Sequence, residues 1–437
     1  MNTDTIKLFS KRDFNKKLKN ISLCTKTGRV ISITGNTARI KIGEIKIGDE
    51  VEIGERKNIE DSTLESTRGI VTSFEDSTAV VTLLGDKEGL KINDIVHIRD
   101  NNKTKVILKN YRGNIYNSLG QEVYSKINYP IQTKEIEVSK QYSIPHPLTR
   151  SQINEKLETG IASIDRLLTL GVGQRICVFA EPGTGKTTLL QNLAKTKNTT
   201  YNIIVLVGER GREVQEFIDH RLSPERLEKT TIFYSTSDET PYLRINSLNL
   251  ALSMAEQLRA KGEDVLLLVD SLTRILRAAR DVGLSNGELP IRAGYPLSVY
   301  SLLPKIFEHG GKIRLADSEK AGSITSIFTA LINNPDNESI DDPFIEEIKG
   351  VSDGHIYLSR DIANQGVYPA IDHLKSLSRL QNDLISPNEK ELVKKFRESL
   401  QRVKEEKSLS VLSGNKSNEL LKAESLLEKI NNKIIKN

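Results

Sequence analysis

The sequence predicts an α/β fold: a P-loop core of parallel strands, with a small β-barrel before it and a helical domain after it. Three patterns support this prediction. Short alternating apolar and polar stretches occupy residues 29–98, continuous apolar runs separated by helical stretches occupy 176–270, and apolar residues recur at helical spacing after residue 386. At 437 residues the chain is long enough for two or three domains.

The first twenty residues are basic. Six lysine or arginine residues outnumber two aspartates, and five apolar residues among them leave one face for a short helix. We prefer a frayed basic terminus. The alternative is a helix that docks on a partner or on anionic lipid.

Residues 29–98 predict a small closed barrel. Six short stretches are separated by polar turns such as Gly35-Asn36 and Gly48-Asp49. A barrel of this size can bind an oligonucleotide, but Phe74 is the only aromatic residue between 29 and 98 that could stack on a base. A structural or assembly role is therefore the better interpretation.

Residues 180–188 predict a phosphate-binding loop. They read A-E-P-G-T-G-K-T-T and join the apolar run 176–179 to the helical stretch 189–194, which is the strand, loop and helix order of a P-loop. Its glycines let backbone N–H groups surround a phosphate, its lysine adds a cation and its threonine offers a hydroxyl to Mg²⁺. Ala180 replaces the first glycine of the strict pattern, and the alternative is a turn whose glycines serve packing alone. The expected nucleotide contacts are Glu181, Pro182, Gly183, Thr184, Gly185, Lys186, Thr187 and Thr188.

Two carboxylates follow the next apolar runs. Glu209 comes after the run 203–207, and Asp270 directly follows the run 265–269. The carboxyl ends of parallel strands form the ligand-binding edge of an α/β sheet. We therefore expect Glu209 to polarise an attacking water and Asp270 to reach Mg²⁺, directly or through water. The alternative for Glu209 is an ordinary charged loop in which glutamates pair with arginines.

The stretches outside these motifs set the boundaries. Residues 100–150 are irregular and end at the rigid Pro145-His146-Pro147, whereas 157–168 predicts a short helix. The stretch 284–298 is too rich in Gly and Pro to be regular throughout, and we expect the charged segment from Gly310 to Ala321 to be an exposed loop.

The C-terminal segment predicts two amphipathic helices joined at Ser413-Gly414-Asn415. Their apolar stripes are expected to pack against the P-loop domain. The resulting division is a basic segment 1–20, a β-barrel 21–100, a P-loop domain 101–385 and a helical domain 386–437.

Charge and cysteine content limit the class of protein. Lys and Arg exceed Asp and Glu by five, 63 against 58, and the pI is 8.8, which is weak support for a nucleic-acid or membrane partner. Cys24 and Cys177 lie far apart and imply no disulfide framework, which suits a reduced cytosolic interior. Because no stretch has the apolar length of a signal peptide or a membrane span, we expect a soluble protein that reaches a membrane only through partners.

Taken together, these motifs resemble the ATPases of type III protein secretion systems. This group serves the injectisome and flagellar export and is related to the catalytic subunit of rotary ATP synthases. The resemblance covers residues 145–380, with weaker agreement in the barrel. Besides the P-loop, the matching stretches are L-E-T-G-I-A-S-I-D-R-L-L at 157–168, G-Q-R at 173–175, G-E-R-G-R-E at 208–213, T-S-D at 236–238, D-S-L-T-R at 270–274, G-Y-P-L-S-V at 294–299, G-S-I-T at 322–325, D-G-H-I-Y-L-S-R at 353–360, Y-P-A-I-D at 368–372 and S-L-S-R at 376–379.

The resemblance implies a role for each polar residue of the core. Lys186 and Thr187 would contact phosphate and Mg²⁺, Glu209 would be the catalytic carboxylate, and Asp270 would be the second acidic residue near the metal. Arg210, within G-E-R-G-R-E, joins the expected nucleotide contacts. The fold implied is a RecA-like nucleotide-binding core.

The resemblance also implies a ring. Tyr368 matches an aromatic residue that packs on adenine, and Arg379 matches an arginine that reaches into a neighbouring subunit's site; Arg360 is a second candidate for that arginine. Because this chain carries both Glu209 and Arg379, a self-sufficient homohexamer is expected. An arginine supplied between subunits stabilises charge on the transferring phosphoryl group.

The expected function is MgATP hydrolysis that releases chaperones from cargo, unfolds it and feeds it into a type III export apparatus. The implied partners are stator or regulator proteins, a central stalk and chaperone–cargo complexes, at the cytoplasmic face of the inner membrane, with no nucleic acid. Two alternatives stay open: a ring-shaped RNA translocase, which would show stimulation by single-stranded RNA that weakens with salt, and a rotary ATPase catalytic subunit. The residues do not separate injectisome from flagellar export.

Overall fold

This computed structural model describes residues 27–54, 66–85, 87–99, 105–109, 111–125, 135–139, 144–220, 224–314, 322–332, 343–413 and 418–435. They fall into two compact units, Met1–Lys103 and Thr104–Asn437, and each is described by itself. The basic segment 1–20, Cys24 and the turn at residues 414–415 lie outside the described residues.

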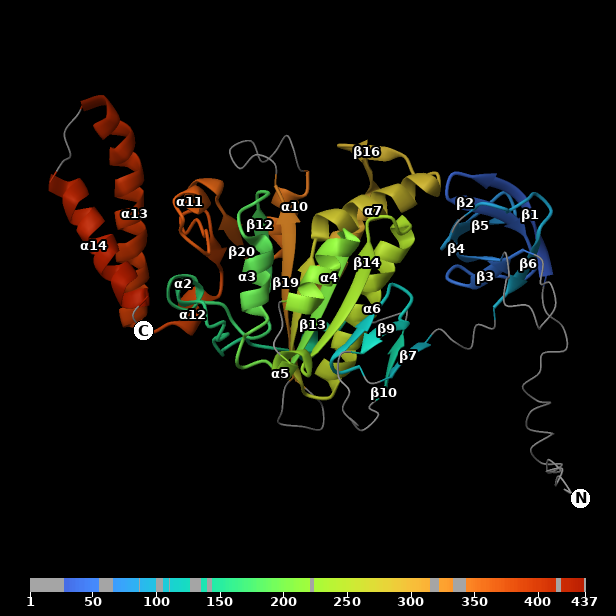
Figure 1. Cartoon of the computed structure of the whole chain (residues 1–437), viewed down its shortest axis with the longest axis horizontal. Coiled ribbons are helices and arrows are strands. Elements are labelled where there is room, and N and C mark those ends of the chain that lie inside the picture. Colours follow the sequence, from blue (N-terminus) through green and yellow to red (C-terminus); the bar gives the residue numbers. More distant parts are fainter. Residues whose placement is uncertain are drawn as a thin grey trace, which may run out of the picture. The chain divides into compact units, whose positions relative to one another are not determined.

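The first unit is a closed barrel of six antiparallel strands (Figure 1). The strand order is β1-β2-β5-β4-β3-β6, and β1 closes the barrel by pairing with β6 through Thr27 and His97. Alternate residues such as Val30, Ile40 and Val81 fill the interior, whereas Phe74 is half exposed. The predicted barrel is confirmed. Its strands are β1 (Thr27–Thr34), β2 (Thr37–Lys41), β3 (Glu50–Ile53), β4 (Thr67–Glu75), β5 (Thr78–Leu83) and β6 (Ile95–Ile98).

The second unit is built on a mostly parallel sheet, in which the order β21-β20-β12-β19-β15-β13-β14-β8-β9 runs from one edge to the other. The central strands from β20 to β8 are parallel to one another. At the two edges, β21 pairs antiparallel with β20, and β9 pairs antiparallel with β8. The strands are β8 (Asn114–Tyr116), β9 (Glu122–Ser125), β12 (Arg175–Ala180), β13 (Tyr201–Glu209), β14 (Thr230–Thr236), β15 (Asp264–Asp270), β19 (Gly322–Leu331), β20 (Gly354–Leu358) and β21 (Leu377–Ser378).

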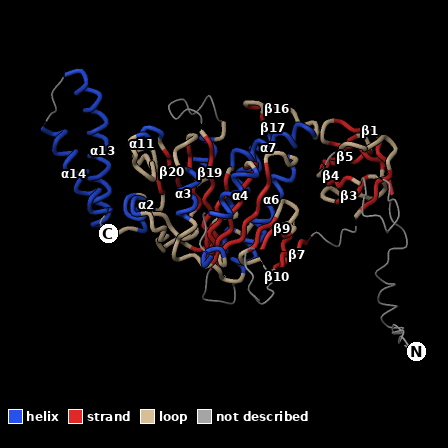
Figure 2. Tube along the Cα trace, in the orientation of Figure 1, coloured by secondary structure: helices blue, strands red, loops and turns tan. Residues whose placement is uncertain are grey.

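Helices cover both faces of this sheet (Figure 2), which explains the continuous apolar runs of its strands. Along β13, Ile203 and Val205 join one buried cluster with α6, α7, α8 and α10, whereas Ile204 and Leu206 join the other with α2, α3 and α4. The helices are α2 (Ala162–Leu167), α3 (Lys186–Leu193), α4 (Gly211–His220), α5 (Pro224–Leu227), α6 (Pro241–Ala260), α7 (Leu272–Ser285), α8 (Leu297–Glu308), α10 (Ile345–Val351) and α11 (Arg360–Asn364).

Two sequence expectations need correction. Residues 105–139 contain strands where an irregular stretch was expected, because β8 and β9 extend the main sheet and β7 (Lys105–Lys109) pairs with β10 (Glu135–Ser139). The second correction concerns the segment from Gly310 to Ala321, which was expected to be an exposed loop but begins with a strand. β18 (Gly311–Ile313) pairs with β19 and with β11 (Arg150–Ser151), and Gly310 and Gly311 are buried. Residues 315–321 lie outside the described residues.

The two predicted C-terminal helices are α13 (Pro387–Ser413) and α14 (Asn418–Ile435). A short helix that was not predicted, α12 (Gln381–Leu384), precedes them. Figure 1 shows α13 and α14 side by side. Phe396 is buried against Leu167 of α2, and Leu392, Leu400 and Leu427 pack around this pair. Remaining short elements are the 3₁₀ helix Pro147–Thr149, β16 (Pro290–Arg292) and β17 (Tyr295–Pro296).

None of the helices in the described part of the chain combines the length and the apolarity that crossing a bilayer requires.

Candidate functional site

The predicted phosphate-binding loop lies between the end of β12 at Ala180 and the start of α3 at Lys186. Gly183 and Gly185 have φ values of +83° and +84°, in the left-handed region that glycine adopts without strain. The Thr184 hydroxyl donates to the Glu181 carbonyl oxygen at 2.8 Å and closes the turn. Backbone and helix start thus have the conformation by which such loops surround a phosphate.

Three charged residues, one at the start of α3 and two at strand ends, meet beside this loop. Lys186 forms an ion pair with Asp270, the last residue of β15, and its Nζ lies 4.0 Å from Oε1 of Glu209, the last residue of β13. All three side chains are largely buried, between 5% and 13% exposed. They meet because β12, β15 and β13 are parallel and end at the same edge of the sheet. The structure brings together the residues that the sequence predicted for phosphate, metal and water.

Two further residues complete the cluster and were not assigned a role from the sequence. Arg274 Nη1 lies 2.5 Å from Glu209 Oε1, and the Thr329 hydroxyl donates to Asp270 Oδ1 at 2.9 Å. Arg274 lies four residues after Asp270, in the first turn of α7. It is the last residue of the D-S-L-T-R motif, so this motif could have identified it as a site residue. Thr329 lies inside the buried strand β19, and no sequence pattern distinguishes it.

The pKa of Glu209 is raised above the ordinary value of a glutamate. Burial is the main cause, and a hydrogen bond with Glu213 raises the pKa further. The Arg274 and Lys186 cations act in the opposite direction but do not outweigh these effects. A carboxylate with a raised pKa is a stronger base, as a residue that orients and deprotonates water requires.

Tyr368 lies over the loop. A Cβ placed on Gly185 would come within 3.4 Å of the Tyr368 ring, and the tyrosine side chain is 60% exposed. The ring therefore offers one open face beside the P-loop. Arg210 does not join the cluster: it is 79% exposed, and its nearest carboxylate is Glu213 at 4.0 Å.

Arg379 stands far from the P-loop of its own chain. It directly follows β21, which pairs with the first two residues of β20, and its backbone N–H donates to Asp353 O at 2.9 Å. Its guanidinium donates to Lys349 O at 2.8 Å. The P-loop begins level with the last residue of β20, so about 13 Å of strand separates the two.

Magnesium can be tested against the donor set. Among the residues that the structure describes, no group of three or more His, Cys, Asp or Glu is arranged to hold a metal ion. Mg²⁺ on a nucleotide needs only one or two protein oxygens, because phosphates and waters supply the rest. Thr187 at the start of α3 and Asp270 at the end of β15 are oxygen donors at the same sheet edge, so the residues present fit the ion.

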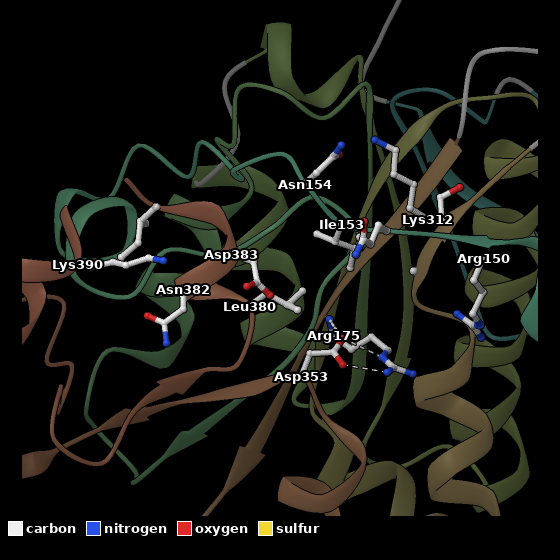
Figure 3. Close-up of a pocket in the computed structure, with 15 residues that line it drawn as sticks. Arg150, Ile153, Asn154, Arg175, Lys312, Asp353, Leu380, Asn382, Asp383 and Lys390 are labelled. Atoms are coloured by element: carbon white, nitrogen blue, oxygen red, sulfur yellow. Dashed lines mark hydrogen bonds and ion pairs between the residues drawn. The ribbon is translucent and has the colours of Figure 1, made fainter. Parts of the chain in front are cut away.

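A pocket of about 690 Å³ opens at the opposite end of the strands (Figure 3). Arg175, at the start of β12, is one of the cationic residues that line this pocket. Its guanidinium is bound to Asp353 at 2.9 Å and to Glu308 at 2.7 Å. Arg150 is bound to the same Glu308. Because these charges neutralise one another, we place the candidate active site at the P-loop.

Comparison with known proteins shows the family of this chain. The model of the ATP synthase alpha/beta family, nucleotide-binding domain, matches residues 160–378, about half of the chain. The SPI-1 type 3 secretion system ATPase of Salmonella typhi is 36% identical over 376 residues, which cover 85% of this chain and 84% of that protein. This chain belongs to the ATP synthase alpha/beta family, among its type III secretion and flagellar export ATPases.

Members of this group resemble the chain to different extents. The flagellum-specific ATP synthase of Bacillus subtilis is 40% identical over 263 residues, 60% of this chain but only 58% of that relative's length. Among solved structures, the assembled ATPase EscN of the enteropathogenic E. coli type III secretion system has a TM-score of 0.79 and 30% identity, covering 91% of this chain and 92% of EscN. A second structure holds EscN in complex with its central stalk EscO, with a TM-score of 0.75, 31% identity and 89% of each chain covered. The fold described above is therefore that of these export ATPases.

Proposed function

We propose that this chain hydrolyses MgATP within a homohexameric ring, and that hydrolysis powers chaperone release, unfolding and export of protein cargo through a type III secretion apparatus. The observation that carries the proposal is the cluster beside the P-loop. There Lys186, the first residue of α3, meets Glu209 and Asp270, the last residues of the neighbouring strands β13 and β15.

The proposal gives each of the predicted site residues a distinct task. Lys186 binds the phosphates, and the loop's backbone N–H groups surround them. Thr187 and Asp270 hold Mg²⁺, which neutralises phosphate charge when bound. Glu209 accepts a hydrogen bond from the attacking water and orients it; its raised pKa favours proton acceptance. Tyr368 packs on the adenine.

Arg379 serves the neighbouring subunit in this proposal. Its place at the far end of β20 keeps it from its own P-loop, whereas its exposed position allows it to enter an adjacent site. A guanidinium supplied across a subunit interface stabilises the charge of the transferring phosphoryl group and makes hydrolysis depend on assembly. A ring of six identical chains provides one such arginine for each site.

The proposed partners follow from the secretion relatives. We assign a central stalk, by analogy with the EscN–EscO complex, together with stator or regulator proteins and chaperone–cargo complexes. The chain would act at the cytoplasmic face of the inner membrane, bound there through these partners. Nucleic acid is not among them, since the barrel presents only Phe74 for base stacking.

The decisive test is ATP turnover by the Glu209→Gln variant of the full chain. We expect phosphate release to fall by at least about 100-fold, because a general base contributes that much, while nucleotide binding and ring assembly persist. Glu216→Gln is the matched control, since Glu216 lies on the adjacent helix α4, paired with the exposed Arg212. Full turnover in Glu209→Gln would refute the role given to Glu209.

A further inference from the structure

The segment 359–371 folds back on itself and reaches the P-loop at two points. Ser359 N–H donates to Ala370 O at 2.9 Å, and Leu358 forms a bridge with Ile371, which closes the segment at its base. One contact is the Tyr368 ring beside Gly185. The other is Arg360, the first residue of α11.

Arg360 is bound to the P-loop of its own chain. Its Nη2 donates to Pro182 O at 3.1 Å, its Nε lies 3.9 Å from Glu181 Oε2, and its backbone N–H donates to Glu181 Oε1 at 3.4 Å. Glu181 is only 11% exposed, whereas Arg360 is 55% exposed. The carboxylate is therefore enclosed within the loop, and the guanidinium covers it from outside.

A carboxylate at this place needs a counter-charge. The loop is shaped to surround an anion, and a second negative charge close to a polyphosphate repels it, more strongly where water is excluded. Arg360 supplies the opposite charge. It also ties the segment that carries Tyr368 to the loop that carries Lys186.

We propose that Arg360 is a positioning residue for nucleotide binding: it neutralises Glu181 and holds segment 359–371, with Tyr368, against the P-loop of the same subunit. This inference rests on the proposed function, since it takes the loop to bind ATP. It also assigns Arg360 to its own subunit and leaves Arg379 as the arginine for the neighbour.

The test compares Arg360→Gln, Glu181→Gln and the double variant of the full chain, with ADP carrying a fluorescent methylanthraniloyl group as the binding probe and ATP turnover as the second readout. In Arg360→Gln the carboxylate loses its counter-charge, so we expect Kd for the probe and KM for ATP to rise about fivefold, the scale of a partly exposed ion pair. The value of kcat should stay within about twofold, because no group that touches the reacting atoms is lost.

The double variant decides the mechanism. Removing Glu181 as well takes away the uncompensated charge, so Kd should return most of the way towards the wild-type value. A role for Arg360 as a direct phosphate ligand predicts no such recovery, and a role as the arginine of the neighbouring site predicts loss of kcat with unchanged Kd; either result would overturn the proposal. Arg360→Lys, which keeps the charge, should bind the probe more tightly than Arg360→Gln and serves if the latter fails to fold.

The two proposals fail in different ways. Wild-type chain that binds the probe but never turns over ATP would refute the proposed function and leave the Kd comparison valid. Wild-type chain that does not bind the probe would refute both. Normal turnover with no Kd difference among the variants would refute the Arg360 assignment alone.

Discussion

At the scale of single residues, the reactivity of the site is set by a balance around Glu209. Burial raises the pKa of this carboxyl group, the hydrogen bond with Glu213 raises it further, and Arg274 and Lys186 lower it. Burial wins because removing water penalises the charged form more than two partly screened cations favour it. Glu209 thus stays close to Arg274 while keeping the basicity of a proton acceptor.

This balance predicts a shift in the pH profile of the Glu213→Gln variant. Since Glu213 raises the pKa of Glu209, its removal lowers that pKa, and Glu209 stays ionised to lower pH. The acid limb of kcat/KM against pH should therefore move to lower pH than in the wild type. Glu216→Gln should leave the limb in place, and an upward shift in Glu213→Gln would contradict the assigned cause.

The sequence predicted most of the residues of the site, but it did not predict which side chains they contact. The P-loop lysine and the two strand-end carboxylates follow from motif order alone. Arg274 lies 65 positions after Glu209 in the sequence, and only the adjacency of β13 and β15 brings the two side chains to 2.5 Å. A pairing of this kind depends on strand order, which no local pattern contains.

At the scale of elements, the P-loop and segment 359–371 constrain each other. Gly185 combines two features: its φ is +84°, which favours glycine, and the Tyr368 ring lies 3.4 Å from the position of a Cβ, which is van der Waals contact. Gly183 has only the first feature, since its φ is +83° and no atom lies within 4 Å of its Cβ position. The two glycines therefore separate backbone strain from side-chain contact.

We expect Gly185→Ala to weaken nucleotide binding more than Gly183→Ala. Both substitutions introduce left-handed strain of about 1–2 kcal/mol, which should lower the free energy of unfolding equally. Only the methyl group at 185 would lie against the Tyr368 ring, at van der Waals distance, where it would restrict the movement of that ring towards the nucleotide proposed to pack on it. Urea unfolding and binding of the fluorescent ADP probe measure the two effects; equal binding losses would show that the ring contact is unimportant.

At the scale of the whole molecule, the residues proposed for catalysis lie at the two ends of the strands. Lys186, Glu209 and Asp270 stand at the carboxyl edge of the sheet, and Arg379 stands beside the amino end of β20. A single chain cannot bring these ends together, because the parallel strands between them are paired with their neighbours and packed on both faces. A complete site under the proposed function therefore requires two chains.

Mixed rings test this division. Glu209→Gln and Arg379→Ala should each be inactive alone, but mixing them should restore part of the ATP turnover, because some interfaces then join an intact Glu209 to an intact Arg379. Mixing Glu209→Gln with Lys186→Ala is the control. Every site in these rings lacks either Glu209 or Lys186 on the subunit that supplies the P-loop, so all sites should stay inactive. No recovery in the first mixture, with assembly verified by light scattering, would argue against an arginine supplied between subunits.

The sequence by itself determined the class of fold, the barrel, the P-loop and the identity of the strand-end carboxylates, because periodicity and motif order are local properties of the chain. The tertiary structure alone decided that β8 and β9 extend the main sheet, that Gly310 and Gly311 are buried, that Arg274 faces Glu209, and that Arg360 and Arg379 stand at opposite ends of β20. These are outcomes of long-range strand pairing. They depend on which segments pack side by side, and hence on the free energy of the whole fold rather than on any one stretch of it.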